Sequence, residues 1–178
     1  AWYENNGSES FTARTITSSA DGALSVYAFD LDGDGDIDVL SASYLDDKIA
    51  WYENNGSESF TAHTITTSAN GARSVYAVDL DGDGDIDVLS ASGNDDKIAW
   101  YENDGSESFT ARTITTSASW AQSVYAVDLD GDGDIDVLSA SYNDDKIAWY
   151  ENDGSESFTA RTITTSADGA WSVYAVDI

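Results

Sequence analysis

The segment that determines the fold is Asp30-Leu31-Asp32-Gly33-Asp34-Gly35-Asp36-Ile37-Asp38, and it returns at 79–87 and 128–136. Carboxylates stand at positions 1, 3, 5 and 9, and a backbone carbonyl is available at position 7, which is the oxygen-ligand spacing of a calcium loop. Glycine at position 6 suits the sharp turn of such a loop, because a Cβ there would obstruct the chain. The sequence therefore predicts three complete cation-binding loops.

Each loop is predicted to hold its ion through the four side chains at positions 1, 3, 5 and 9 and the main-chain carbonyl at position 7. The predicted metal residues are Asp30, Asp32, Asp34, Asp36, Asp38, Asp79, Asp81, Asp83, Asp85, Asp87, Asp128, Asp130, Asp132, Asp134 and Asp136. Oxygen ligands favour Ca²⁺, and Mg²⁺ is a weaker candidate because it tolerates flexible all-protein cages poorly. The alternative is a solvated acidic turn, in which inward carboxylates without a cation would repel one another. Position 12 is Ser41 instead of the glutamate of an EF-hand.

The three loops belong to a 49-residue repeat. Ala1-Trp2-Tyr3-Glu4-Asn5 returns from Ala50, and the same five-residue pattern begins again at Ala99 and Ala148. A period of this length lies in the range of propeller blades. We interpret residues 1–178 as one repeat array with units 1–49, 50–98, 99–147 and a truncated 148–178.

Each unit contains four short segments that are rich in β-branched and aromatic residues and separated by Gly, Asn, Asp and Ser. In the second unit they are 48–53, 60–66, 74–79 and 87–92. Val75-Tyr76-Ala77-Val78 is apolar on both faces, which is typical of an inner strand between two neighbouring sheets. The sequence therefore predicts an all-β fold, a β-propeller of four-stranded antiparallel blades, with an incomplete ring in one chain.

The predicted blades are cut at both ends of the chain. The first strand expected is the third of a blade and the last is the first of another, so we count 15 strands and three whole blades. Asp177 would begin a fourth loop. Unpaired sheet edges are a liability that a propeller removes by closing its ring. We therefore expect a homo-oligomer in which a second copy completes the ring, or a fragment of a longer propeller.

The motifs resemble a known family. The Asp-x-Asp-Gly-Asp-Gly-Asp-x-Asp loop, the strand 75–79 before it, the strand 87–92 after it and the Ile-Ala-Trp-Tyr-Glu-Asn strand at 98–103 are similar to FG-GAP-like (VCBS) repeats. Those repeats build calcium-bearing propellers of the integrin-α type and of some fungal lectins. The resemblance implies about seven blades, a place outside the cell or at its surface, and binding instead of catalysis. Because the Phe-Gly and Gly-Ala-Pro signatures of the integrin branch are absent, integrin-like recognition is not carried over.

The repeats differ from one another mainly on one predicted face. Alternate connections of an antiparallel meander emerge on the same side, so the calcium loops share one face with the turns between the third and fourth strands. The turns between the second and third strands share the other face with the connections that lead into the next blade. On that other face we predict ligand contacts by Leu24, Tyr44, Arg73, Asn94, Trp120, Gln122, Tyr142, Asn143 and Trp171. Tyr, Trp, Arg and Asn supply contact area and adaptable hydrogen bonds. The alternative is that loops vary freely because they carry little packing.

Composition excludes several classes of function. The formal net charge of −27 argues against nucleic acid or an anionic membrane as partner. No apolar run approaches the roughly 20 residues that span a bilayer. There is no cysteine for thiol chemistry, and the one histidine, His63, stands where the other units have arginine, so no catalytic triad is predicted.

We therefore expect a non-enzymatic, extracellular, Ca²⁺-stabilised binding or adhesion module. Its ligand is a glycan by first preference, because of the aromatic residues on the variable face, or else a protein. The alternative is a structural or self-assembling repeat scaffold, engineered or excised, that binds no ligand.

Overall fold

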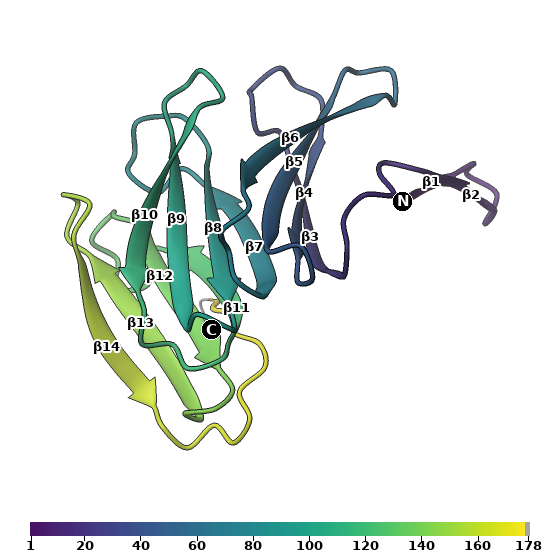
Figure 1. Cartoon of the computed structure of the whole chain (residues 1–178). Coiled ribbons are helices and arrows are strands. Elements are labelled where there is room, and N and C mark those ends of the chain that lie inside the picture. Colours follow the sequence, from purple (N-terminus) through teal and green to yellow (C-terminus); the bar gives the residue numbers. More distant parts are fainter. Residues whose placement is uncertain (177–178) are drawn as a thin grey trace.

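The computed structural model describes residues 1–176, which form β-strands joined by turns (Figure 1). The strands are β1 (Trp2–Asn5), β2 (Phe11–Arg14), β3 (Ala23–Phe29), β4 (Asp38–Ser43), β5 (Lys48–Asn54), β6 (Phe60–Thr66), β7 (Ala72–Val78), β8 (Asp87–Ser92), β9 (Lys97–Asn103), β10 (Phe109–Thr115), β11 (Ala121–Val127), β12 (Asp136–Ser141), β13 (Lys146–Asn152) and β14 (Phe158–Thr164). The strands predicted at 60–66 and 87–92 match β6 and β8 residue for residue. Residues 1–176 contain no helix long and apolar enough to cross a membrane.

Twelve of these strands build three four-stranded antiparallel meanders, which we call blade 1 (β3–β6), blade 2 (β7–β10) and blade 3 (β11–β14). The blades stand side by side like the ribs of a fan, and the hairpin β1–β2 lies apart beyond blade 1 (Figure 1). The all-β, blade-like architecture expected from the repeat is confirmed.

The predicted count of 15 strands is wrong by one within the described residues. Segment 172–176 has the sequence of an inner strand but belongs to no sheet. In blade 3 the inner strand β11 is held by pairing with β12. Segment 172–176 pairs with no strand in the described part of the chain, and Tyr174 is 71% exposed. The fourth loop expected from Asp177 lies outside the described residues.

The inner strands of neighbouring blades contact one another directly. The ring of Tyr76 lies 4.7 Å from that of Tyr27 and 5.1 Å from that of Tyr125, measured between centroids. Burial raises the pKa of Tyr76, and hydrogen bonding and charge interaction with Tyr27 add to that rise. The backbone N–H of Val75 donates to Oγ of Ser25 at 3.4 Å. The N–H of Val124 donates to Oγ of Ser74 in the same way, so β7 and β11 each satisfy part of their free edge with a side chain of the preceding blade.

Two hydrophobic cores lie between the blades and not within any one sheet. The core between blades 1 and 2 includes Leu31, Leu40, Ala42, Ile49, Trp51, Ala69, Ala72, Val75, Ala77, Val88, Ala99 and Tyr101. The core between blades 2 and 3 repeats it one unit later with Leu80, Leu89, Ala91, Ile98, Trp100, Ala118, Ala121, Val124, Ala126, Val137, Ala148 and Tyr150. Full burial of a Val or Leu side chain contributes roughly 1.5–3 kcal/mol. Blade stacking therefore contributes substantially to stability, and it fixes the positions of the loops at both ends of each blade.

Candidate functional site

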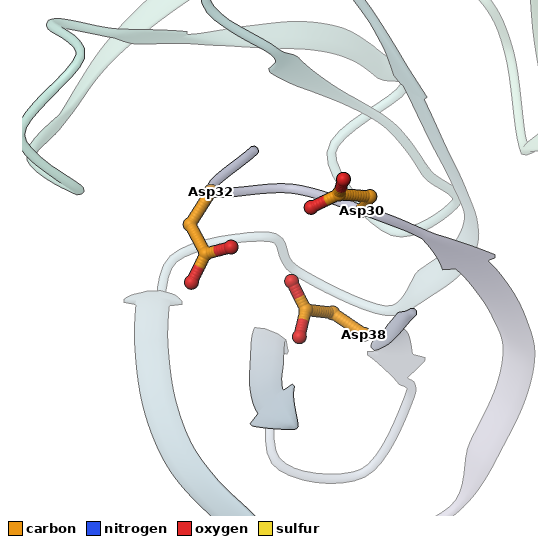
Figure 2. Close-up of side chains that lie close together, drawn as sticks. All are labelled: Asp30, Asp32 and Asp38. Carbon is orange, nitrogen blue, oxygen red and sulfur yellow. The ribbon is translucent and has the colours of Figure 1, made fainter. Parts of the chain in front are cut away.

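The three acidic loops join the first and second strands of the blades and bring carboxylates together. In each loop the side chains at positions 1, 3 and 9 place one oxygen apiece within 4.8 Å of the others. Figure 2 shows this for Asp30, Asp32 and Asp38, whose carboxylates turn toward a common space. The corresponding groups are Asp79, Asp81 and Asp87 in blade 2, and Asp128, Asp130 and Asp136 in blade 3.

The ninth position is the buried anchor of the loop. Asp87 is fully buried, and its carboxylate accepts the backbone N–H groups of Leu80 at 3.0 Å and Asn103 at 2.8 Å. Burial raises the pKa of Asp87 to about 7, although these two N–H groups act in the opposite direction. Asp38 and Asp136 occupy the same buried position and accept the equivalent N–H groups. The loop is thereby tied to the third strand of its own blade.

The first position curls the loop. In blade 2, Asp79 accepts the N–H groups of Gly82 at 2.8 Å and Gly84 at 3.1 Å. Gly84 has φ +99°, in the left-handed region where a side chain is strained. The glycine predicted at position 6 is therefore required by its backbone conformation. The expected obstruction by a Cβ is wrong, because a Cβ on Gly84 would have no atom within 4 Å.

Positions 5 and 7 lie outside the carboxylate groups. Asp83, at position 5, accepts the N–H of Asp85 at 2.9 Å. The side chain of Asp85, at position 7, lies against Gly105, where a Cβ would approach its Oδ2 to 2.4 Å. The structure therefore gathers three of the four predicted side-chain ligands, while Asp34, Asp83 and Asp132 point their Oδ1 atoms back into the loop.

The gathered carboxylates suit a hard cation. All donors are oxygens, as Ca²⁺ prefers. Burial raises the pKa of Asp81, and the charges of Asp83 and Asp79 raise it further. Burial likewise raises the pKa values of Asp32 and Asp130. Close, partly desolvated carboxylates repel one another, and a divalent cation would relieve that repulsion.

A further acidic group lies between blades 2 and 3 and was missed by the sequence analysis. It consists of Asp81, Glu102 and Glu156, beside a cavity of about 380 Å³. Arg112 pairs with both Glu102 and Glu156, so part of this charge is already compensated. The three residues come from different units, and no motif along the sequence predicts that they lie close together.

On the opposite face, two sets of turns interlock. The N–H of Tyr44, after β4, donates to the carbonyl of Gly22, before β3, at 3.0 Å. The carboxylate of Asp47 accepts the N–H of Gly71 at 2.8 Å and its carbonyl accepts the N–H of Ala69 at 3.0 Å, so blade 1 is tied to the start of blade 2. Asp96 and Asp145 make the same links. The sequence analysis did not predict this link, and the signal that could have revealed it is the exact repetition of the aspartate at this position in each unit.

Arg73 joins three blades on this face. Its guanidinium lies 4.9 Å from the ring centroid of Tyr44 in blade 1 and 4.7 Å from that of Trp120 at the start of blade 3. It also donates to Oε1 of Gln122 at 3.1 Å. Gly93 makes room for it, because a Cβ there would lie 2.5 Å from Nε of Arg73. We call Tyr44, Arg73, Trp120 and Gln122 the arginine stack.

Trp120 has an unusual backbone. Its φ is +57°, whereas the other units place Gly22, Gly71 and Gly169 at this position with φ between +62° and +66°. A bulky residue in the left-handed region costs about 1–3 kcal/mol and persists only where its surroundings hold it. Its N–H donates to the carboxylate of Asp96 at 2.7 Å and its ring contacts Arg73.

The remaining predicted ligand residues are more open. Trp171 is 64% exposed and Tyr142 is 44% exposed, and their rings meet edge to face at 6.0 Å. Asn143 is exposed beside them, and Leu24 is exposed at the blade 1 end of the face. Asn94 is exposed and accepts a hydrogen bond from the hydroxyl of Tyr44 at 3.3 Å.

Comparison with known families agrees with this geometry. A model described as FG-GAP-like repeat matches residues 1–41, 30–90, 79–139 and 128–178. The chain belongs to the FG-GAP-like repeat family. The resemblance drawn from the loop and strand motifs is thereby confirmed.

Among solved structures, FG-GAP-like blades of this chain are similar to an Agrocybe aegerita lectin. The TM-score is 0.60 and the identity 18%, over 89% of this chain and 45% of the lectin chain. That lectin is described as specifically recognising non-reducing terminal N-acetylglucosamine. The chain spans less than half of the lectin's length, and at this identity the likeness shows the propeller fold alone. A comparison with curated proteins gave no match.

The FG-GAP-like loops and the variable face thus differ in how the structure arranges the predicted residues. Positions 1, 3 and 9 converge in all three loops. On the variable face, Tyr44, Arg73, Trp120 and Gln122 form one packed stack, while Tyr142 and Trp171 form a separate open pair. Ligand contact by these residues stays a prediction.

Proposed function

We propose that the chain is a non-enzymatic, calcium-stabilised propeller module that binds carbohydrate through the face opposite the acidic loops. The observation that carries the carbohydrate proposal is the open pair of Tyr142 and Trp171 beside the exposed amide of Asn143. Aromatic faces supply apolar contact area at low entropic cost, and an amide supplies directional hydrogen bonds. The lectin neighbour supports this choice of ligand class by its fold.

The calcium part of the proposal rests on the acidic loops. Ca²⁺ would be held by the carboxylates of positions 1, 3 and 9, with position 5 and the carbonyl of position 7 available to complete the shell. When bound, the ion supplies positive charge that compensates the gathered carboxylates. The chain's own residues curl the loop and tie it to the third strand. The lack of the EF-hand glutamate at position 12 favours weak sites, which suit the millimolar calcium of an extracellular location.

The carbohydrate proposal is tested with Trp171→Ala. Wild type is applied to a glycan array in millimolar calcium, and binding is then measured by titration calorimetry, with N-acetylglucosamine as the first probe. We expect Trp171→Ala to weaken binding at least about tenfold, because loss of a stacking aromatic costs more than about 1.4 kcal/mol.

The matched control is Tyr3→Ala, which removes a ring of similar exposure, 65%, from the hairpin β1–β2. It should bind as wild type does. An array that stays blank for the wild-type protein, or equal binding by wild type and Trp171→Ala, would overturn the proposal.

A second candidate is a structural repeat scaffold, and the arginine stack favours it. Arg73 is half-buried and donates to Gln122, which is buried and in turn donates to the carbonyl of Trp120. Variation on this face therefore serves blade packing at one junction. A blank array together with ordered self-assembly would support the scaffold.

A further inference from the structure

Blade 1 leaves one apolar face open. We call it the leading face and define it by Ala23, Val26 and Ala28, which point away from blade 2. Val26 is 70% exposed, whereas its equivalents Val75 and Val124 are 4% exposed because a preceding blade covers them. The side chain is valine in all three blades, and the exposed fraction differs because only blades 2 and 3 have a preceding blade packed against it.

Blade 3 leaves the opposite face open. We call it the trailing face and define it by Leu129, Trp149 and Ile163. Leu129 is 37% exposed, whereas its equivalents Leu31 and Leu80 are 3% and 2% exposed under the next blade. Ile163 is 54% exposed.

The two open faces are complementary, since the chain already joins them twice. The core between blades 1 and 2 packs the trailing face of one blade on the leading face of the next, and the core between blades 2 and 3 repeats the contact with residues one unit later. The open faces of blades 1 and 3 carry the corresponding side chains. Each open face would therefore meet the same kind of surface that its equivalents meet inside the chain.

We propose that a second copy of this chain docks head to tail, so that the trailing face of one copy and the leading face of the other lie on either side of one shared blade. The partner is chosen by continuity with the two junctions inside the chain. Because the two faces differ, the interface is heterologous, and repeated docking gives a ring if the rotation closes. This inference is independent of carbohydrate binding.

The chain ends add contacts to this junction. A cavity of about 390 Å³ lies against the leading face, lined by Trp2, Ile16, Val26 and other mostly apolar residues. It lies where the inner strands of a preceding blade would sit. At the other end, segment 172–176 already lies along β11: the N–H of Val173 donates to Oγ of Ser123 at 3.4 Å, and the rings of Tyr174 and Tyr125 are 4.8 Å apart.

Docking would therefore place segment 172–176 of one copy in the cavity of the other, next to the hairpin β1–β2. The segment reads Ser-Val-Tyr-Ala-Val, the same five residues as the inner-strand stretches 74–78 and 123–127. One shared blade would then contain strands from both copies. Because each copy carries a net charge of −27, repulsion opposes docking, and added salt should strengthen it.

The test uses two charge variants of the full chain, Val26→Asp on the leading face and Ile163→Asp on the trailing face. Both side chains are exposed, so both variants should fold, which circular dichroism checks. Sedimentation velocity across a concentration series should show wild type assembling. Each variant alone should associate roughly a hundredfold more weakly, because docking would bury an uncompensated charge.

An equimolar mixture of the two variants decides the geometry. Val26→Asp keeps an intact trailing face and Ile163→Asp an intact leading face, so the mixture should form dimers and stop there. The control Thr116→Asp adds the same charge in an exposed loop away from both faces and should assemble as wild type does. A wild type that stays monomeric at about millimolar concentration with high salt would overturn the proposal. So would a mixture that stays monomeric while wild type assembles.

Discussion

The two ends of each blade differ in how far their side-chain contacts repeat from one unit to the next. At the acidic end the three units make the same contacts: the N–H of Leu31, Leu80 or Leu129 reaches the ninth-position carboxylate at 3.0 Å in every case. At the variable end, by contrast, the arginine stack joins blades 1, 2 and 3, and the Tyr142–Trp171 pair lies at the end of blade 3. Contacts made by residues that every unit shares are copied with the repeat, whereas contacts made by the variable side chains depend on which neighbours meet.

The difference teaches where the energy of each end should lie. The acidic end holds close carboxylates whose mutual repulsion an added cation would relieve, so its stability should depend on the solution. The variable end is compensated by its own side chains, so its stability should depend on particular residues. Four experiments test this division.

Calcium should have the largest effect. At a free concentration a hundredfold above the dissociation constant, each site adds about 2.7 kcal/mol to the free energy of unfolding, or about 8 kcal/mol for three independent sites. Thermal unfolding in EDTA, and again after calcium is restored, measures this. Magnesium at equal concentration should stabilise less. Identical unfolding curves in EDTA and calcium would show that the loops are acidic turns without an ion.

Asp87→Ala should be the most damaging substitution at the acidic end, even in EDTA. It leaves the buried N–H groups of Leu80 and Asn103 without acceptors, at about 1–3 kcal/mol each. Urea denaturation should show a loss of about 2–6 kcal/mol. Asp83→Ala, in the same loop but exposed, should lose less than about 1 kcal/mol in EDTA. Equal losses would mean that the ninth position is not the anchor.

Arg73→Ala should be the most damaging change at the variable end. It removes the guanidinium between two rings and leaves Oε1 of Gln122 unpaired, for a loss of about 2 kcal/mol that calcium does not restore. Arg112→Ala, which removes an exposed guanidinium from over Trp100, should lose about 0.5–1 kcal/mol. A larger loss for Arg112→Ala would contradict a packed arginine stack.

Trp120→Gly should have the smallest net effect. Glycine relieves the strain of a positive φ, about 1 kcal/mol, but the contact with Arg73 is lost, so the net change should be below about 1 kcal/mol. In an Arg73→Ala background the contact is already gone, and the same substitution should then stabilise by about 1 kcal/mol. A double-mutant cycle measures the coupling, and purely additive effects would show that the ring and the guanidinium do not interact.

Much of this molecule was predictable because it is local and repeated. The four strands of a unit and the carboxylates at positions 1, 3 and 9 follow from short spacings in a single segment. Glycine at position 6 indicated a backbone conformation with positive φ, and Gly84 has φ +99°.

What escaped the sequence depends on contacts between units. The link from Asp47 to Gly71 crosses from one blade to the next, and Arg73 finds Tyr44 and Trp120 in two different blades. Segment 172–176 has a strand's sequence but no neighbour to pair with in the described part of the chain, so composition alone counted one strand too many. β-strand propensity describes the preference of a segment by itself, whereas a strand in a sheet also needs a second segment with which to form hydrogen bonds.

The space at Gly93 has a consequence for folding. Strands β4, β8 and β12 have the same sequence, Asp-Val-Leu-Ser-Ala-Ser, so an inner strand could mispair with the copy from a neighbouring unit. The Arg73 side chain occupies the space that a Cβ at Gly93 would need, and the other units have Tyr44 and Tyr142 at this position. A slipped pairing would therefore force the Arg73 side chain to move away from Tyr44 and Trp120. The missing side chain of Gly93 thus favours the native order of nearly identical units.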